Sequence, residues 1–220
     1  MEPVAVLASG GLDSSVLLAD LAQQSEVYPV YVRKGLVWED TERRFLTSFI
    51  EALASPNVRP PATLDLPVGP LYGTHWSLSG MDVPGSEAPD SAVFLPGRNI
   101  LLIALAGVWC YTHRVHRIAI GSLGGNPFPD ATPQFFDGIA DVISQGLDYD
   151  VRVEVPYRGL HKEDIIARFS SLPLHLTLTC ISPVNGVHCG RCNKCHERRG
   201  AFTRAGVDDN TEYSNDRTES

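Results

Sequence analysis

The feature that most constrains the fold is a glycine turn between two apolar segments near the N-terminus. Residues 3–8 are apolar, residues 9–15 read Ser-Gly-Gly-Leu-Asp-Ser-Ser, and residues 16–21 are again largely apolar. Adjacent glycines allow a sharp turn and a close approach of the backbone to a ligand. The helix expected after the turn offers unpaired N–H groups and the positive end of its dipole. The order of strand, loop and helix therefore predicts a phosphate-binding loop.

Short β-rich segments alternate along the chain with longer segments of helical periodicity. This alternation predicts the α/β class, with a Rossmann-like parallel sheet and helices on both of its faces. In such folds, ligands bind beyond the carboxyl ends of the strands. The expected strands are 3–8, 27–32, 62–66, 117–121 and 151–155, and the expected helices are 16–21, 39–53, 99–111, 133–147 and 161–169.

The glycine turn matches neither of two common phosphate-binding sequences. It lacks the lysine–hydroxyl pair of a Walker A loop and the spacing of the dinucleotide fingerprint. It contains Asp13 instead, whose carboxylate could hold Mg²⁺ between itself and phosphates. The alternative is an ordinary Gly-Gly turn in which Asp13 caps the following helix.

The pattern Ser-Gly-Gly-x-Asp-Ser resembles the pyrophosphate loop of the ATP pyrophosphatases, which cleave ATP between its α and β phosphates. The resemblance implies ATP and Mg²⁺ as ligands and a sheet of the adenine nucleotide alpha hydrolase type. Adenosine is expected across the carboxyl edge of the sheet, near the ends of the second and fourth strands. The nucleotide-binding residues are then Leu7, Ala8, Ser9, Gly10, Gly11, Leu12, Asp13, Ser14, Ser15, Val32 and Gly121.

Four of the five cysteines lie within sixteen residues near the C-terminus, with eight, two and two residues between them. An odd count argues against a disulfide framework and favours metal binding. Four thiolates suit structural zinc, although an iron–sulfur cluster or unmetallated buried cysteines are the alternatives. The candidate ligands are Cys180, Cys189, Cys192 and Cys195. Cys110 lies in an apolar helix and is expected in the core.

The formal net charge is −8, and half of it lies in the polar segment 205–220, which we predict to be disordered. The remainder of the chain is only mildly acidic, so a nucleic-acid partner is not expected. No apolar run is long enough to cross a bilayer, and no basic region precedes the first apolar segment. We therefore expect a cytoplasmic protein without a membrane partner.

Several further segments restrict the choice among the families that share this loop. Residues 94–99 read Phe-Leu-Pro-Gly-Arg-Asn, residues 160–164 read Leu-His-Lys-Glu-Asp, and Thr-Leu-Thr-Cys at 177–180 leads to the cysteine array at 189–196. Together with the loop they resemble the 7-cyano-7-deazaguanine synthases, over about residues 4–202. The resemblance favours Zn²⁺ at the four cysteines and implies a homodimer.

The resemblance also implies an ATP-dependent carbon–nitrogen ligase. A 7-carboxy-7-deazaguanine would be adenylated, and ammonia or an amine would displace AMP to give an amide, which a second adenylation converts to the nitrile. The implied catalytic residues are Asp13, Ser14, Arg98 and Lys162. The alternatives are a solvated surface lysine for Lys162 and an ordinary helix-start arginine for Arg98.

One segment departs from the family pattern. The family carries Tyr-Pro-Asp-Cys-Arg after the fourth strand, whereas residues 128–132 read Phe-Pro-Asp-Ala-Thr. The segment that shapes the substrate pocket in the family is therefore altered, while the segments that the resemblance assigns to ATP binding are retained. This allows an acceptor amine on another protein, as in a defence-type system. A tRNA-thiolation enzyme and a nucleotide-binding regulatory module are two further candidate functions, and Cys110 is poorly placed for thiolation.

The expected organisation is an ATP-binding α/β domain at 1–172, a zinc-binding segment at 173–204 and the polar tail at 205–220. Within the first domain, residues 67–91 are rich in Gly, Pro, Ser and Asp. This stretch is too long for a plain connection, so it is a candidate active-site lid.

Overall fold

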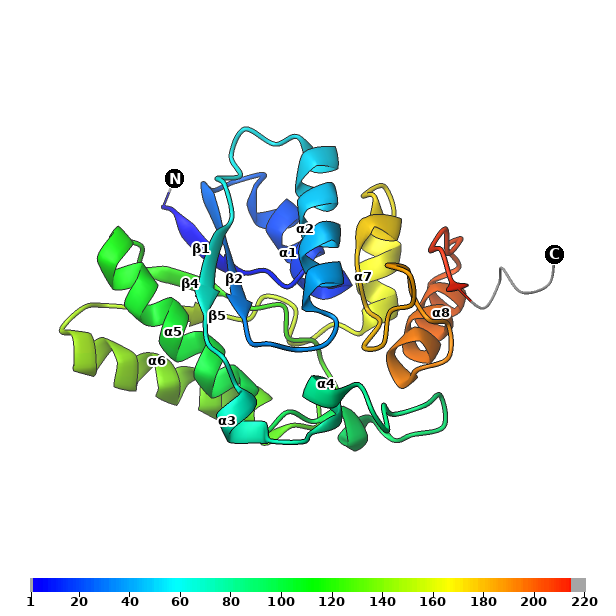
Figure 1. The fold of residues 1–220 in the computed structure, drawn as a ribbon. Coiled ribbons are helices and arrows are strands. Elements are labelled where there is room, and N and C mark those ends of the chain that lie inside the picture. The colour runs from blue at the N-terminus through cyan, green and yellow to red at the C-terminus, as the bar shows by residue number, and fades with distance from the viewer. Residues whose placement is uncertain (1, 215–220) are drawn as a thin grey trace.

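Five parallel strands form one sheet in the computed structural model, which describes residues 2–214 of the 220-residue chain (Figure 1). The strand order is β3-β2-β1-β4-β5. The chain therefore runs from the central β1 through β2 to β3 at one edge, and then crosses to β4 and β5 on the other side of β1. The predicted Rossmann-like α/β fold is confirmed. The strands are β1 (Val4–Leu7), β2 (Val27–Arg33), β3 (Ala62–Asp65), β4 (Arg117–Ala119) and β5 (Arg152–Glu154).

The helices lie on both faces of this sheet (Figure 1). Helices α1 and α2 cover one face, and α5 and α6 cover the other. The α-helices are α1 (Leu12–Leu21), α2 (Glu39–Leu53), α3 (Gly69–Tyr72), α4 (Trp76–Ser79), α5 (Arg98–His113), α6 (Pro133–Leu147), α7 (Lys162–Arg168) and α8 (Asn193–Ala205). Three short 3-10 helices are η1 (Asp90–Val93), η2 (Pro129–Ala131) and η3 (Leu174–Leu176).

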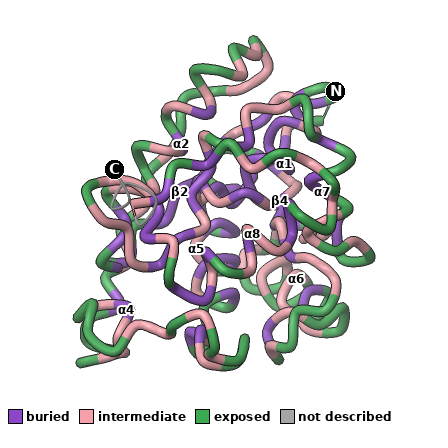
Figure 2. Tube along the Cα trace, turned by 90° about the vertical axis from the view of Figure 1, so that its right-hand side faces the viewer, coloured by how far each residue is buried: buried purple, intermediate pink, exposed green. Residues whose placement is uncertain are grey.

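The two faces of β1 belong to two different hydrophobic cores, because successive strand residues point to opposite sides of a sheet. Val4 and Val6 pack in the core that includes α1, α2, α7 and α8. Ala5 and Leu7 pack in the core that includes α5 and α6. Figure 2 shows β2 in the colour of buried residues over most of its length. A strand buried on both faces explains the continuous apolar runs of the sequence.

The C-terminal segment packs on the α1 side of the sheet. Ala201 and Phe202 of α8 enter the same core as α1, and the four cysteines lie in a neighbouring cluster with Leu36 and Trp38. The metal-binding candidate is therefore built against the half of the fold that contains α1 and the glycine loop before it.

The expectation of disorder from residue 205 onward is wrong for residues 205–214. Thr211 and Tyr213 are buried, and the Ser214 backbone N–H donates to the His188 carbonyl at 2.8 Å. The Tyr213 hydroxyl donates to Asp209 Oδ2 at 2.6 Å. An aromatic side chain and a hydrogen-bonded carboxylate thus order a segment whose composition is otherwise polar. Residues 215–220, the remainder of the expected tail, lie outside the described residues.

Residues 67–91, the candidate lid, contain two short α-helices as well as loop segments. These are α3 and α4, and Trp76 of α4 stacks on Trp38 with ring centroids 5.7 Å apart. Closure over a ligand stays a prediction. Among residues 2–214, no helix has the length and apolar character needed to cross a membrane.

Candidate functional site

A cavity of about 670 Å³ opens at the carboxyl edge of the sheet. Its walls come from the loop after β1, the ends of β2 and β4, the start of α5, the start of α7 and the cysteine-containing segment. Most of the predicted nucleotide and catalytic residues line it: Leu7, Ala8, Ser9, Gly11, Leu12, Asp13, Ser14, Val32, Arg98, Gly121 and Lys162. Gly10 and Ser15, also predicted, are absent from the lining that the described residues form.

Gly10 shapes the loop from behind the cavity wall. Its φ is +76°, and a Cβ placed there would lie 2.6 Å from the Glu42 carbonyl oxygen. The Gly10 carbonyl accepts from the Leu178 N–H at 2.8 Å, which ties the loop to the segment that leads to Cys180. A side chain at this position would therefore meet both conformational strain and a backbone clash. Ser15 is fully buried behind the same wall.

The serine hydroxyls of the loop hydrogen-bond within the loop itself. The Gly11 N–H donates to Ser9 Oγ at 3.2 Å, and Ser14 Oγ donates to the Gly11 carbonyl at 3.2 Å. Gly121, after β4, lies against the first turn of α1, because a Cβ there would be 3.0 Å from the Asp13 carbonyl. The loop is thus held in a compact shape, and the first residues of α1, Leu12, Asp13 and Ser14, line the cavity.

One end of the cavity is expected to hold phosphates, and we call it the phosphate end. It carries two carboxylates and two amines, those of Asp13, Glu197, Lys162 and Lys194. Lys162 Nζ lies 3.6 Å from Asp13 Oδ2 and 2.5 Å from Glu197 Oε1. Lys194 Nζ lies 2.5 Å from Glu197 Oε2. The sequence pattern does not single out Glu197, because its position on a C-terminal helix gives no sign that it reaches this loop.

At both Asp13 and Lys162, burial and the oppositely charged neighbours shift the pKa in opposite directions. Desolvation lowers the pKa of Lys162, but the Asp13 and Glu197 carboxylates outweigh it and hold that pKa above its usual value. Desolvation raises the pKa of Asp13 despite the neighbouring Lys162. Asp13 Oδ1 is buried, and no group in residues 2–214 hydrogen-bonds to it. An orphaned carboxylate oxygen beside a phosphate loop fits a Mg²⁺ ligand.

A second charged group lines the cavity around Lys34, Glu42 and Arg98. Lys34 is buried and its Nζ donates to the Val32 carbonyl at 2.9 Å. Glu42 accepts from the Tyr31 hydroxyl and from Trp38 Nε1, both at 3.1 Å. Burial lowers the pKa of Lys34 and raises that of Glu42. Sequence reasoning missed Lys34 as a site residue, although its place just after the second predicted strand was a usable signal.

Of the three positions at which this segment departs from the family pattern, Ala131 and Thr132 pack into the scaffold, whereas Phe128 lines the cavity. Thr132 caps α6 by accepting from the Phe135 N–H at 3.2 Å, and Ala131 packs beside the core under α5. Asp130 lines the cavity, and its carboxylate accepts from the Asn99 N–H at the start of α5. Asp130, which matches the family pattern, thus faces the site.

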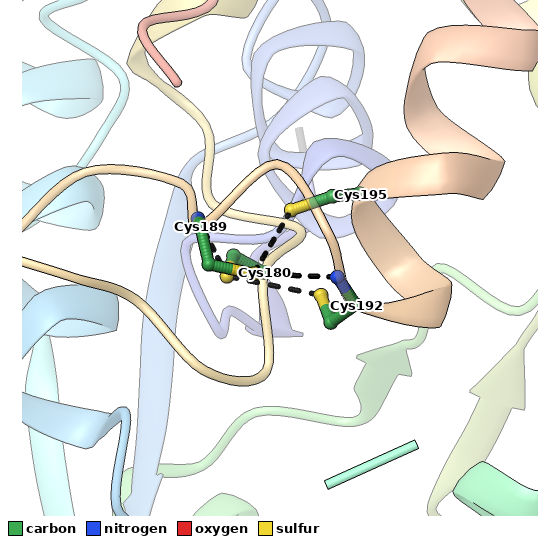
Figure 3. A group of neighbouring side chains, drawn as sticks. All are labelled: Cys180, Cys189, Cys192 and Cys195. Carbon is green, nitrogen blue, oxygen red and sulfur yellow. Dashed lines mark hydrogen bonds between the residues drawn. The ribbon is translucent and has the colours of Figure 1, made fainter. Parts of the chain in front are cut away.

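The four cysteines converge as the spacing predicts (Figure 3). Their sulfurs lie within 4.8 Å of one another, with Cys180–Cys192 at 3.8 Å and Cys189–Cys195 at 3.9 Å. Four sulfurs at about 2.3 Å from one tetrahedral ion lie about 3.8 Å apart, so the cluster fits a single zinc ion. An iron–sulfur cluster places several atoms between its thiolates and needs a wider spacing. The buried His188 lies outside the ligand set, and its Nε2 accepts from the Thr179 N–H.

Comparisons with known proteins agree with this geometry. The family model described as queuosine biosynthesis protein QueC matches residues 3–206. The 7-cyano-7-deazaguanine synthase of Methanopyrus kandleri is 31% identical over 233 aligned positions, covering 97% of this chain and 99% of that protein. Those of Methanothermobacter thermautotrophicus and Brucella ovis are 29% and 30% identical, covering 97% and 94% of this chain and 99% and 92% of those proteins.

A solved structure shares the fold. It is described as a predicted subunit of tRNA methyltransferase from Methanocaldococcus jannaschii, with a TM-score of 0.50 and 12% sequence identity. The match covers 77% of this chain and 75% of that one. At this identity the likeness concerns the arrangement of strands and helices alone.

Proposed function

Because the chain belongs to the QueC family, we propose that it adenylates the carboxylate of a 7-deazaguanine acid and transfers the acyl group to a nitrogen nucleophile. AMP and pyrophosphate are the nucleotide products. The observation that carries the proposal is the single cavity into which the loop 9–14, Lys162, Arg98 and Asp130 all open. It joins a phosphate-binding loop to the segments that carry the family resemblance.

At the phosphate end, the loop residues hold and polarise the phosphates. The N–H groups of the first turn of α1 and the Ser9 and Ser14 hydroxyls donate to phosphate oxygens. Lys162 offsets the charge that develops on the leaving pyrophosphate. Asp13 would hold Mg²⁺, which supplies charge neutralisation to the phosphates when bound. The adenosine lies along Val32 and Gly121 at the ends of β2 and β4.

In the proposed reaction, a carboxylate oxygen attacks the α-phosphorus and the bond to pyrophosphate breaks. The nitrogen nucleophile then attacks the acyl carbon, loses a proton, and AMP leaves. With ammonia the product is an amide. The amide oxygen then attacks the α-phosphorus of a second ATP and pyrophosphate leaves, after which loss of two protons from the nitrogen and departure of AMP give the nitrile. Arg98 and Lys34, two of the cationic residues that line the cavity, orient the acid before it reacts in this proposal.

The four cysteines have a structural role in this proposal. A closed set of thiolates leaves no open coordination position for substrate, and Zn²⁺ bound there stabilises the segment that carries α8. We also propose a cytoplasmic homodimer that acts on a small deazapurine, without membrane or nucleic-acid partners.

Protein conjugation is the second candidate, because the substitutions at Ala131 and Thr132 remove a reactive thiol and a cation from the altered segment. In that case the acceptor is an amine of another protein and the reaction stops at an amide. A thiolation enzyme is less well supported. Cys110 is buried outside the cavity lining, and burial raises the pKa of its thiol to about 12. The intact loop argues against a purely regulatory module.

The experiment is mass spectrometry of the products formed from ATP, 7-carboxy-7-deazaguanine and ammonia. AMP together with an amide or nitrile of the deazaguanine supports the proposal. ADP as the nucleotide product, or no nucleotide cleavage with this acid, would overturn it.

A further inference from the structure

Lysine is confined to one region of this molecule. The chain has three lysines and fifteen arginines, and Lys34, Lys162 and Lys194 all line the cavity. Lysine carries a compact charge on a flexible stem, whereas arginine presents a rigid planar fork. The position of each lysine ammonium must therefore be fixed by its neighbours. For Lys162 these neighbours can be identified from the contacts.

The partner that fixes Lys162 is Glu197. The distance from Lys162 Nζ to Glu197 Oε1 is 2.5 Å, a charged hydrogen bond, whereas Asp13 Oδ2 is 3.6 Å away and only within ion-pair range. The Lys162 side chain is 11% exposed, so little water competes for its ammonium. Without Glu197, the amine would have one distant carboxylate on one side and an open cavity on the other.

Glu197 reaches this place because the cysteine cluster sets the start of α8. The helix begins at Asn193, directly after Cys192, and Cys195 lies in its first turn. Figure 3 shows Cys195 on this helix, facing the other three cysteines. Two residues later the carboxylate of Glu197 projects towards the phosphate end, while α7 and α8 lie side by side in Figure 1.

The buried Arg198 fixes the rotation of α8 about its axis. Its guanidinium donates to Thr177 Oγ1 at 3.0 Å, to Thr179 Oγ1 at 2.8 Å and to the Leu174 carbonyl at 2.8 Å. The next residue along the helix from Glu197 is thus anchored on several sides. Such supporting contacts define the position of a functional side chain more closely than an isolated ion pair does.

We propose that Glu197 is a positioning residue that holds the Lys162 ammonium beside the phosphate loop, so that the folded cysteine cluster determines the geometry of the phosphate end. The inference rests on the proposed function in one respect, namely that ATP phosphates bind at the loop 9–14. It gives the metal segment a part in nucleotide chemistry.

The competing explanation is that Glu197 only balances charge within α8, where Lys194 pairs with it three residues away at 2.5 Å. A pair of that kind contributes little stability. It would leave the Lys162 amine where it is when Glu197 is replaced. The two explanations therefore differ in what happens at Lys162.

The first test needs no turnover. With ¹⁵N-lysine labelling the NH₃⁺ region of the NMR spectrum contains three signals, which Lys→Arg variants assign. We expect Glu197→Gln to shift or broaden the Lys162 signal and to leave the Lys34 signal unchanged, while one metal per chain is retained. Removal of the metal with a chelator should change the Lys162 signal in the same way. An unchanged Lys162 signal in Glu197→Gln would overturn the proposal.

The second test is a double-mutant cycle on AMP formation. We expect Glu197→Gln to lower kcat about tenfold or more, as displacement of a catalytic group does. The Kd for Mg²⁺-ATP should not rise, because the substitution removes a negative charge from the phosphate end. In a Lys162→Met background the same substitution should change kcat less than twofold. Glu51→Gln, on the exposed face of α2, is the matched control and should leave kcat unchanged.

Equal losses in both backgrounds, or loss of kcat only in parallel with loss of metal, would overturn the positioning role. If the parent protein forms no AMP from the deazaguanine acid, the proposed function fails. The NMR test still decides the inference in that case, with Mg²⁺-ATP as the probe that should perturb Lys162.

Discussion

Asn99 and Asp130 are joined by two hydrogen bonds that connect the start of α5 to the loop after β4. The Asn99 N–H donates to Asp130 Oδ2 at 2.9 Å, and Asn99 Nδ2 donates to the Asp130 carbonyl at 2.8 Å. Both side chains are buried. The preceding residue in α5 is Arg98, so this link sets where its guanidinium enters the cavity.

Asp130→Ala should therefore weaken both stability and substrate use. The substitution leaves the Asn99 N–H unsatisfied in a buried place, which costs about 1–3 kcal/mol of unfolding free energy. Urea denaturation measures this change, and KM for the acid substrate should rise as Arg98 loses its fixed position. Asp137→Ala, on the exposed face of α6, is the control and should change the unfolding free energy by less than about 0.5 kcal/mol. A control-sized effect for Asp130→Ala would contradict this role of the link.

Asp13→Asn should abolish most AMP formation without harming the fold. Burial raises the pKa of Asp13, so the native state keeps this proton to a higher pH than the unfolded chain does. The unfolded state therefore loses its proton first, and the parent loses stability as pH rises above about 4, the unfolded value. The asparagine variant lacks this loss. Thermal melts between pH 4 and 8 should show the variant gaining stability relative to the parent as pH rises.

Mg²⁺ supplies a companion measurement. If Asp13 is a ligand, millimolar Mg²⁺ should raise the melting temperature of the parent with ATP and have a smaller effect on Asp13→Asn. Equal Mg²⁺ responses of the two proteins would show that Asp13 does not hold the ion.

Cys192→Ser should lose the metal and much of the C-terminal fold. Elemental analysis of the parent should find one zinc per chain, since the sulfur spacing fits a single tetrahedral ion. Metal binding and local folding are coupled, so the serine variant should be poorly soluble and bind less than one zinc. Cys110→Ser, a buried cysteine outside the cluster, controls for loss of a thiol from the core. Iron with sulfide in the parent, or no metal in a well-folded parent, would contradict the zinc assignment.

Tyr213→Ala should destabilise the protein although it lies in an acidic C-terminal segment. Its ring is buried against His188, and its hydroxyl donates to Asp209 at 2.6 Å. Loss of a buried aromatic side chain costs about 3–5 kcal/mol, whereas Tyr213→Phe loses only the hydrogen bond, about 1 kcal/mol. Denaturation of both variants tests this order, and equal stability of Tyr213→Ala and the parent would show that residues 205–214 do not contribute to the fold.

Local patterns predicted the sheet, the loop and the cysteine cluster because their signals lie in neighbouring residues. Gly10 and Gly11 follow an apolar strand, and Cys189, Cys192 and Cys195 are separated by a few positions. The contacts between distant segments were not predictable in this way. Glu197 meets Lys162 across 35 positions, and only the packing of α8 on α7 brings them together.

Amino-acid composition is a poor guide where a few specific contacts hold polar side chains within the fold. The segment 205–214 is polar, yet Arg198 Nε donates to Thr211 Oγ1 at 2.8 Å inside the protein. Glu42 lies among the acidic residues of the first turn of α2, yet it accepts two hydrogen bonds at the cavity. In both cases a partner from another element satisfies a polar side chain that is withdrawn from solvent at least in part.

The last prediction concerns the outcome of the reaction. Ala131 and Thr132 stand where the family carries cysteine and arginine, and in this fold they pack beside a core and cap α6. Nitrile formation requires the amide to stay bound and to present its oxygen to a second α-phosphate, which depends on close placement of groups around it. In the proposed reaction, the first adenylation depends mainly on the loop 9–14 and Lys162, which are retained.

We therefore expect the amide or the acyl-adenylate to accumulate over the nitrile in a timed product assay with ammonia. Ala131→Cys combined with Thr132→Arg should raise the ratio of nitrile to amide, and it should also cost about 1 kcal/mol of stability, since the α6 cap is lost. Thr132→Ala removes the cap without adding the cation, so it separates the two effects and should leave the ratio unchanged. Rapid and complete nitrile formation by the parent would show that these two positions do not govern the second step.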